Sequence, residues 1–166
     1  MQILIRPAAI TDLPRLVMVR YGMQPALHRD RIVASDGQTR QYYVAELGQQ
    51  IAGFGLLLLE RPADWTDPLN SFPILVDLFV SESYRSRGIG QALIQHMEAV
   101  AQQHGKTVIY LNVEPIANPR ALALYRRLGY TALQTQPYHN VWSFVDSQGV
   151  QQVREEWLID MCKPLQ

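Results

Sequence analysis

Blocks of apolar residues separated by polar turns predict the strands of the first two thirds of the chain. Two runs rich in β-branched and aromatic residues, 74–80 (ILVDLFV) and 107–113 (TVIYLNV), have the composition of largely buried strands. Two further runs flank the short turn Gly48-Gln49-Gln50 and predict a strand pair. The strands predicted on these grounds are 3–5, 42–47, 51–60, 74–80 and 107–113.

A period of three to four residues predicts the helices. The longest carries its apolar side chains on one face, at Ile89, Leu93, Met97 and Val100. It is predicted to run to about His104, with Gly105 as its stop. A second helix is predicted to begin after an N-cap at Asn118, with Pro119 in its first position, and to end at Gly129.

The two ends of the chain complete the prediction of the fold. Near the N-terminus, Thr11 is the predicted N-cap of a helix from Asp12 to about Tyr21, and another helix falls within residues 22–40. Towards the C-terminus the strand candidates are 130–135, 141–145 and 157–161. A strand–helix–strand–helix centre with an all-strand end predicts an α/β (α+β) fold with a mixed sheet. The length predicts a single domain over residues 1–166.

Composition limits the classes of partner. Fifteen Lys and Arg residues balance fifteen Asp and Glu residues, so no broad nucleic-acid-binding surface is expected, although the balance is compatible with a local anion site. The single cysteine, Cys162, excludes an internal disulfide and favours a reducing cytoplasm. The N-terminus has no long apolar core, and the longest apolar run, 54–59, is too short to span a bilayer. We therefore predict a cytoplasmic protein without a membrane partner.

The segment 83–94 (SYRSRGIGQALI) carries the first chemical signal. It places two arginines and two glycines between a predicted strand and the long helix. The first N–H groups of a helix lack internal partners, glycines allow close approach to them, and arginines add charge-assisted hydrogen bonds. A pyrophosphate or phosphate ester suits such a turn. From the local pattern alone, a plain helix-start turn with two solvated arginines is the alternative.

Two other phosphate-binding motifs do not fit this segment. It contains no G-x-x-x-x-G-K-[ST] sequence, which excludes a nucleoside-triphosphate P-loop. Leu93 occupies the place of the third glycine in G-x-G-x-x-G, which excludes the dinucleotide fingerprint.

Three separate motifs resemble the GNAT superfamily of N-acetyltransferases. Residues 85–90 (RSRGIG) resemble its acyl-CoA-binding motif [RQ]-x-x-G-x-[GA], which lies between a strand and a long helix. Residues 5–13 (IRPAAITDL) resemble the family's opening strand-to-helix signature. Residues 118–130 (NPRALALYRRLGY) resemble its second cofactor motif, N-x-x-A-x-x-L-Y-x-x-x-G-[FY]. The matches occur in the family's order and cover most of residues 3–135.

The resemblance implies a fold and a co-substrate. The fold is a mixed central sheet with helices on both faces, in which strands 74–80 and 107–113 run parallel and splay apart. The co-substrate is acetyl-CoA, whose pyrophosphate would lie on the turn and whose pantetheine arm would lie against the strand before it. The implied cofactor-binding residues are Phe79, Val80, Arg85, Ser86, Arg87, Gly88, Ile89, Gly90, Gln91 and Asn118. The four histidines lack metal-ligand spacing, so no metal is expected.

The resemblance also implies direct attack of an amine on the thioester. Tyr125 occupies the position of the family's general acid, although a tyrosine on a helix can equally be a packed aromatic. Many members place a glutamate base at one of two positions that are held here by Val76 and Asn112, so neither is a carboxylate. Asp77 and Glu114 remain as candidates, and Asp77 is the one assigned to catalysis. A carboxylate in an apolar strand is costly unless paired, which is compatible with catalysis or with a buried salt bridge.

The acceptor is left open by the sequence. The leading hypothesis is acetyl transfer to a primary amine on a small molecule or a peptide. The alternative is a non-catalytic acyl-CoA-binding sensor or scaffold module. Acceptor loops are expected at 22–40, 62–72 and 136–142, where neither sign of charge dominates. A homodimer is compatible with the sequence.

Overall fold

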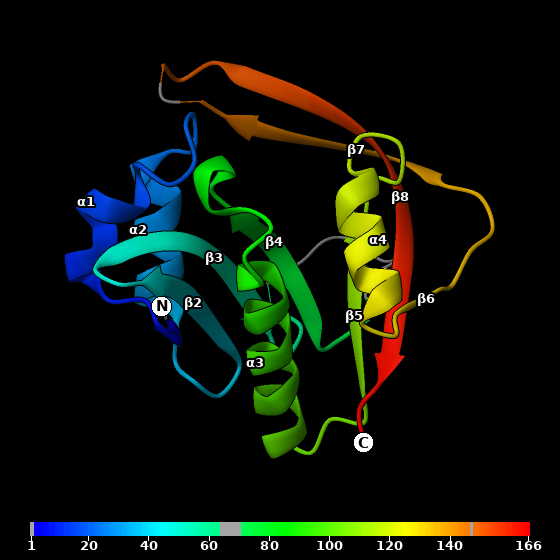
Figure 1. Cartoon of the computed structure of the whole chain (residues 1–166). Coiled ribbons are helices and arrows are strands. Elements are labelled where there is room, and N and C mark those ends of the chain that lie inside the picture. Colours follow the sequence, from blue (N-terminus) through cyan, green and yellow to red (C-terminus); the bar gives the residue numbers. More distant parts are fainter. Residues whose placement is uncertain (1, 64–70, 147) are drawn as a thin grey trace. The chain divides into compact units, whose positions relative to one another are not determined.

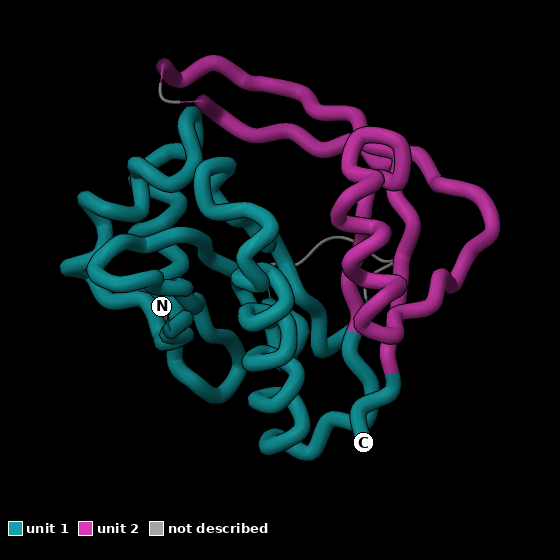
Figure 2. The backbone as a smooth tube through the Cα atoms, viewed as in Figure 1, with its two compact units in different colours: residues 1–109, 164–166 teal, residues 110–163 magenta. Residues whose placement is uncertain are grey.

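The computed structural model describes residues 2–63, 71–146 and 148–166, so most of the acceptor loop expected at 62–72 lies outside the described residues. The chain divides into two compact units (Figure 2). Unit 1 contains residues 1–109 and 164–166, and unit 2 contains residues 110–163. Each unit is built around strands that the apolar runs predict.

Unit 1 contains an antiparallel sheet whose strands pair in chain order (Figure 1). The strands are β1 (Ile3–Pro7), β2 (Arg40–Leu47), β3 (Gln50–Leu58) and β4 (Ile74–Val80). Gly48 has a φ of 68° in the turn between β2 and β3, which favours glycine. The four strands predicted for this unit are confirmed, and residues 74–80 match β4 in both bounds.

Helices cover both faces of the unit 1 sheet. They are α1 (Leu13–Leu16), α2 (Pro25–Ala34) and α3 (Ile89–Gln103). Two neighbouring residues of β2 show the division, because successive side chains of a strand point to opposite faces. Tyr42 contacts His28 of α2, and Tyr43 contacts His96 of α3. With both faces covered, residues 42–45 are all buried, as the continuous apolar pattern of β2 and β3 predicts.

The first predicted helix is much shorter than expected, and its predicted cap is wrong. A 3-10 turn, η1 (Ile10–Asp12), precedes α1, which ends at Leu16. Asp12 rather than Thr11 closes this turn, because its carboxylate accepts the backbone N–H of Ala9 at 2.8 Å. Beyond Leu16 the backbone makes shorter-range hydrogen bonds, such as Val19 N–H to the Leu16 carbonyl at 3.0 Å, which end the α-helix.

The described residues of unit 2 form one helix and four strands. They are β5 (Val108–Val113, whose first two residues belong to unit 1), α4 (Pro119–Arg127), β6 (Thr131–Ala132), β7 (Tyr138–Val145) and β8 (Gln151–Pro164, whose last residue belongs to unit 1). β8 lies between β5 and β6 and also pairs antiparallel with β7, with which it forms a long ribbon (Figure 1). Residues 158–161 of β8 are buried, whereas residues 151–155 are exposed.

The predicted elements of unit 2 are present, with different lengths. The strand predicted at 130–135 is only two residues long, and the one predicted at 157–161 is part of a fourteen-residue strand. The α/β class with an all-strand end is confirmed. The parallel, splayed relation of strands 74–80 and 107–113 joins two units and stays a prediction, as does the single domain. Within the described ranges, no helix combines the length and the apolar character that a membrane crossing requires.

Candidate active site

The turn between β4 and α3 has the open backbone that the sequence predicts. The 3-10 turn η2 (Glu82–Tyr84) follows β4, and Gly88 is the N-cap of α3 with a φ of 80°. A Cβ placed on Gly88 would meet no atom within 4 Å, so a ligand can reach this backbone. The N-cap residue Gly88 has no side chain, so it cannot accept hydrogen bonds from the first N–H groups of α3 as a capping side chain would. Such a helix start can bind an anion.

The two predicted arginines are held along this turn. The Nε of Arg85 donates to the Val80 carbonyl at 3.1 Å, and its guanidinium carbon lies 5.8 Å from the centroid of the Phe79 ring. Arg87 is exposed, and its guanidinium carbon lies 5.5 Å from the ring centroid of Tyr84. These contacts orient both cations and leave further N–H groups available for charge-assisted hydrogen bonds with a ligand.

The end of β4 is fixed by a close approach to β3. The Phe79 ring stacks on Phe54 with centroids 5.6 Å apart, and Val80 lies opposite Gly53. A Cβ on Gly53 would come within 2.6 Å of the Phe79 carbonyl oxygen, so only glycine fits at this position. The strand that leads into the turn is therefore held rigidly on its β3 side.

Asp77 lies at an irregularity of β4 and forms two ion pairs. The register between β3 and β4 shifts at this point, and Asp77 adopts a φ of 53°. Its two carboxylate oxygens accept hydrogen bonds from Arg20 at 2.7 Å and from Arg31 at 2.6 Å. Burial raises the pKa of the carboxyl, but the charges and hydrogen bonds of Arg31 and Arg20 outweigh it and hold the pKa below its usual value. The salt bridge left open by the sequence is present.

A buried histidine and tyrosine lie beside this ion pair, and sequence reasoning missed them. Nδ1 of His28 is 2.8 Å from the hydroxyl of Tyr42, and both side chains are fully buried. Burial raises the pKa of Tyr42 and lowers that of His28 to about 4, so both are neutral at pH 7. Arg31 also hydrogen-bonds the hydroxyl, which directs the hydroxyl hydrogen to Nδ1. The histidine proton is then on Nε2, which has no partner among the described residues.

In unit 2, α4 carries the two remaining predicted residues. Tyr125 is 8% exposed, and its ring lies edge-on to Tyr130 with centroids 6.0 Å apart. Burial raises the pKa of Tyr125 to about 12, so its hydroxyl keeps its proton at neutral pH. Asn118 is at the predicted N-cap position and is exposed, but its side chain does not cap the helix. Its amide is thus not used by the helix start.

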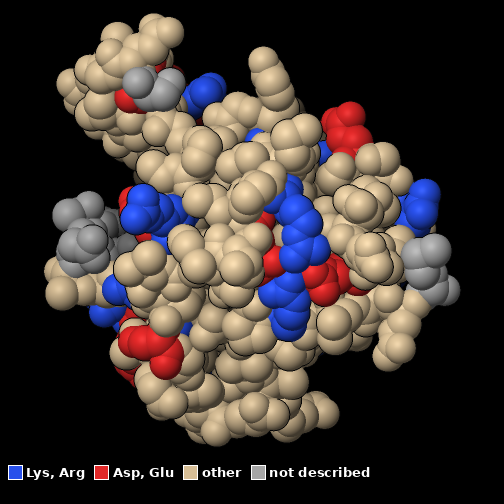
Figure 3. Space-filling model, turned by 90° about the vertical axis from the view of Figure 1, so that its left-hand side faces the viewer, with Lys and Arg blue, Asp and Glu red and all other residues tan. Residues whose placement is uncertain are grey.

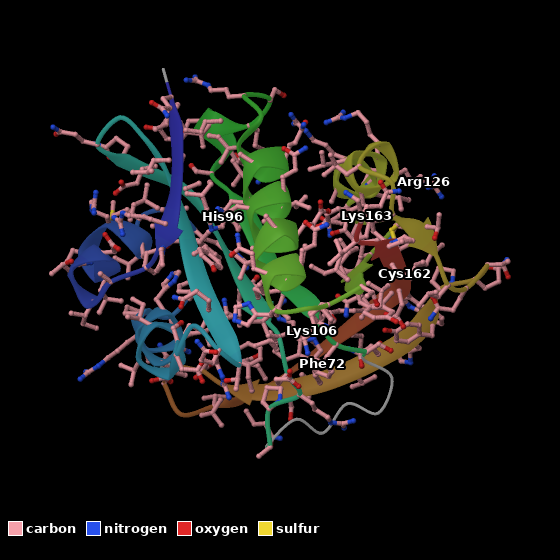
Figure 4. All side chains as sticks on the ribbon, turned by 90° about the horizontal axis from the view of Figure 1, so that it is seen from below. Phe72, His96, Lys106, Arg126, Cys162 and Lys163 are labelled. Carbon is pink, nitrogen blue, oxygen red and sulfur yellow. The ribbon has the colours of Figure 1, made fainter. Side chains whose placement is uncertain are left out.

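The two positions of the family's base and two further residues, Asp160 and Cys162, lie on strands of the two units. Val76 and Asn112, at the family's base positions, are both partly buried. Asp160 of β8, which sequence reasoning missed, is buried, and its carboxylate accepts hydrogen bonds from Tyr138 and Gln134 at 2.8 and 2.9 Å. Cys162 lies near the end of β8 and is partly buried (Figure 4). In the described ranges, no three His, Cys, Asp or Glu side chains gather as metal ligands would.

Comparison with known proteins decides the family. A family model described as the acetyltransferase (GNAT) family matches residues 11–130. The chain belongs to the GNAT acetyltransferase family. It is also 27% identical over 135 residues to an N-alpha-acetyltransferase of Sulfurisphaera tokodaii, which covers 76% of this chain and 78% of that protein. This confirms the predicted family and enzyme class, an acetyl-CoA-dependent N-acetyltransferase.

Solved structures agree with the GNAT fold. A putative acetyltransferase from Salmonella typhimurium, yncA, solved with its cofactor acetyl-CoA, matches with a TM-score of 0.69 at 18% identity, over 100% of this chain and 95% of that one. A ribosomal-protein-alanine N-acetyltransferase from Brucella melitensis matches with a TM-score of 0.68 at 21% identity, over 98% and 99% of the two chains. At these identities the likeness concerns the fold.

The structure brings the predicted GNAT site residues together in two groups. In unit 1, the guanidinium groups of Arg20 and Arg85 both lie over the Phe79 ring, beside the open turn. Arg20 also forms an ion pair with Asp77. In unit 2, Asn118 and Tyr125 lie on the same helix, seven residues apart. That these two groups address one ligand stays a prediction.

Proposed function

We propose that this GNAT protein transfers an acetyl group from acetyl-CoA to a primary amine on a small molecule or a peptide, by direct attack of the amine on the thioester. The observation that carries the proposal is the open N-terminus of α3, where Gly88 exposes backbone N–H groups next to Arg85 and Arg87. The pyrophosphate would bind residues 85–91, and the pantetheine arm would bind the backbone of Phe79 and Val80 and the side chain of Asn118. The cytoplasmic location expected from the sequence is part of this proposal.

The reaction must supply a neutral amine. An alkyl amine resembles lysine, with a pKa of about 10.4, so roughly one molecule in 2,500 is neutral at pH 7, a penalty of about 4.6 kcal/mol. Asp77 was the predicted base, and its role in proton transfer stays a prediction. Both of its oxygens accept hydrogen bonds from arginines, which makes it a weak proton acceptor. Ordered water that passes the proton to solvent is an equivalent route.

Tyr125 would protonate the leaving thiolate. Its pKa of about 12 keeps the hydroxyl protonated over the whole range in which an amine acceptor becomes neutral. A free thiol has a pKa of about 8.5, but burial raises the pKa of a thiol as it raises that of a phenol. Burial of the leaving thiolate therefore narrows the pKa difference between Tyr125, which donates the proton, and the thiolate, which accepts it. Turnover should therefore rise with pH up to about 10 without a descending limb from this tyrosine.

The acid role is tested by Tyr125→Phe. The change keeps the ring and its contact with Tyr130, so the free energy of unfolding should hardly change. Turnover, measured as thiol release from acetyl-CoA with a panel of amines, should fall by roughly 10²-fold or more. Tyr43→Phe removes the hydroxyl of another buried tyrosine and should retain parental turnover. Parental turnover in Tyr125→Phe would assign Tyr125 to packing.

The cofactor site is tested separately by Gly88→Asp. The aspartate adds a negative charge where the phosphates should bind, and calorimetry should show the affinity for CoA falling by at least about an order of magnitude. Gly88→Ala introduces the same backbone strain at a φ of 80° without the charge and should lose less. Equal affinity in Gly88→Asp and the parent would place the cofactor elsewhere. CoA binding by the parent without thiol release on any amine would favour the sensor module.

A further inference from the structure

One arginine beside β4, Arg20, has guanidinium N–H groups that make no hydrogen bond to the described residues. Arg20 follows α1 in the chain, and its Nη1 donates to an oxygen of Asp77 at 2.7 Å. Its Nε and Nη2 make no hydrogen bond to the described residues, and 42% of the side chain is exposed. The Nε–Nη2 edge is one that can bind a carboxylate through two parallel N–H···O bonds. Arg20 is therefore oriented by Asp77 and open to a second carboxylate.

The charge around Arg20 is not balanced. Arg20 and Arg31 share the single carboxylate of Asp77, which leaves one positive charge. His28 and Tyr42, the other titratable groups at this point, are neutral at pH 7. Arg31 is only 14% exposed and also engages Tyr42, so the surplus charge is accessible at Arg20. A ligand with an anionic group is attracted there, and a second cation is repelled.

Arg20 also lies close to the proposed cofactor site. Its guanidinium carbon is 5.2 Å from the centroid of the Phe79 ring, and the guanidinium carbon of Arg85 is 5.8 Å from the same centroid. Its partner Asp77 precedes Val80 by three residues on β4, which is roughly 10 Å of strand away from the turn that would hold the pyrophosphate. An anion on Arg20 would thus lie beside the acyl arm, away from the cofactor phosphates.

We propose that Arg20 binds the carboxylate of the acceptor, so that the acceptor is an amine that also carries a carboxylate, as an α-amino acid does. The inference rests on the proposed acetyl transfer and narrows its substrate class. Asp77 and Arg31 act as positioning residues: Arg31 holds Asp77, and Asp77 holds the Nη1 side of Arg20. Polyamines and lysine-like cations without a carboxylate are poor acceptors in this scheme.

Matched acceptors test the proposal. Thiol release from acetyl-CoA is measured with L-amino acids and with the corresponding L-amino acid amides, which keep the amine and lose the negative charge. For each acceptor, kcat/KM of Arg20→Gln is compared with that of the parent, so differences in amine pKa between acceptors cancel. We expect kcat/KM for the amino acids to fall by roughly 10-fold to 100-fold, mainly through KM, and that for the amides to stay unchanged.

Two further variants control for charge and for folding. Arg20→Lys keeps the charge and its attraction to Asp77 but lacks the two parallel N–H donors of the guanidinium. Its kcat/KM for amino acids should lie between those of the parent and Arg20→Gln. Arg127→Gln removes an exposed arginine at the end of α4 that has no ion pair among the described residues, and it should match the parent with both acceptor sets. Urea unfolding of each variant shows whether stability has changed.

Three results would overturn the inference. An equal fall with amino acids and amides would make Arg20 purely structural. A loss of acetyl-CoA affinity in Arg20→Gln, measured by calorimetry, would move Arg20 to the cofactor site. An unchanged kcat/KM of Arg20→Gln with the amino acids as well as the amides would show that Arg20 does not recognise the carboxylate. If no amine is acetylated, the proposed function fails by itself. Calorimetry with L-amino acids on the acetyl-CoA complex then decides: binding lost in Arg20→Gln supports the inference, and its absence in the parent overturns it.

Discussion

Unit 1 contains two arginine–carboxylate clusters, and they differ in whether their positive and negative charges balance. In the first, Arg6 and Arg15 share two carboxylates, Asp12 and Glu46, and Arg6 grips Asp12 through both nitrogens at 2.7 and 2.8 Å. In the second, Arg20 and Arg31 share only Asp77. On the side of unit 1 that carries α1 and α2, positive and negative side chains are interspersed (Figure 3). The balance of positive and negative charge therefore differs from one cluster to the next.

The difference separates a cluster that supports the fold from one that can bind a ligand. Asp12 is 1% exposed and also accepts the Ala9 N–H, so the first cluster joins β1, β2 and the α1 region with its charges matched. The hydrogen bonds and charges of Arg6 and Arg15 lower the pKa of Asp12 to about 2. The second cluster keeps a surplus cation at its exposed end. An incomplete salt bridge is thus more informative about binding than a complete one.

Breaking the balanced cluster should have the largest effect. Asp12→Asn removes the charge that neutralises Arg6 and leaves two arginines facing a single Glu46. The free energy of unfolding should fall by about 3–5 kcal/mol, the range for breaking a buried pair. Urea unfolding measures it. Glu60→Gln is the matched control. It breaks the 2.6 Å pair with Lys106, in which the Glu60 side chain is 58% exposed, and it should cost less than about 1 kcal/mol.

Acid should affect the two clusters at different pH values. Burial, aided by the charge of Arg31, lowers the pKa of His28 from 6.5 to about 4, so the unfolded chain takes up this proton first. Stability beside the second cluster should fall by about 3 kcal/mol as the pH drops from about 6.5 to 4. Asp12, with its pKa lowered from 3.8 to about 2, should cost about 2 kcal/mol as the pH drops further towards 2.

Urea unfolding over a pH series measures both steps. His28→Gln has no imidazole to protonate, so it should remove the upper step and leave the lower one. A His28→Gln variant with the same loss between pH 6.5 and 4 would show that other groups cause it.

Breaking the unbalanced cluster should have a smaller effect on stability. Asp77→Asn leaves Arg20 and Arg31 without a carboxylate, but 42% of the Arg20 side chain is exposed to solvent, and asparagine tolerates a φ of 53° better than most residues. A loss of about 1–2 kcal/mol in urea unfolding is expected. The pH profile of turnover should keep its shape if Asp77 only positions Arg20. If the turnover of Asp77→Asn no longer falls at low pH as that of the parent does, Asp77 has the predicted role of the base.

The predictable features are local, and the unpredictable ones join distant residues. The turn at Gly88 and the apolar face of α3 are encoded within about twenty residues, so motif and period suffice to find them. Asp77 alone shows that a partner is needed, but its partners lie 57 and 46 residues away at Arg20 and Arg31. The pattern predicts Asp12 as the first residue of a helix, and it does not show that the Asp12 carboxylate pairs with Arg6 on β1.

Two further residues show the limits of pattern. His28 has no periodic signal of burial, since the apolar residues of α2 do not follow a helical period, and only its contact with Tyr42 explains its place in the core. Residues 151–156 are polar except for Val153 and show no apolar–polar alternation, so the first half of β8 could not be predicted, and it exists through pairing with β7. The second cofactor motif predicts Tyr125 and Asn118 as site residues. That both act on one bound acetyl-CoA stays a prediction.

β8 passes from an exposed ribbon to a buried strand within one continuous element, and hydrogen exchange should record that change. The amides of residues 151–155 are protected only by pairing with β7, whose ribbon exposes Val141, Val145, Val153 and Trp157 to solvent. A two-stranded ribbon opens at low free energy. The amides of residues 158–161 lie in the core of unit 2 and exchange only when that core opens. A single strand would therefore report two separate opening events, one at each end.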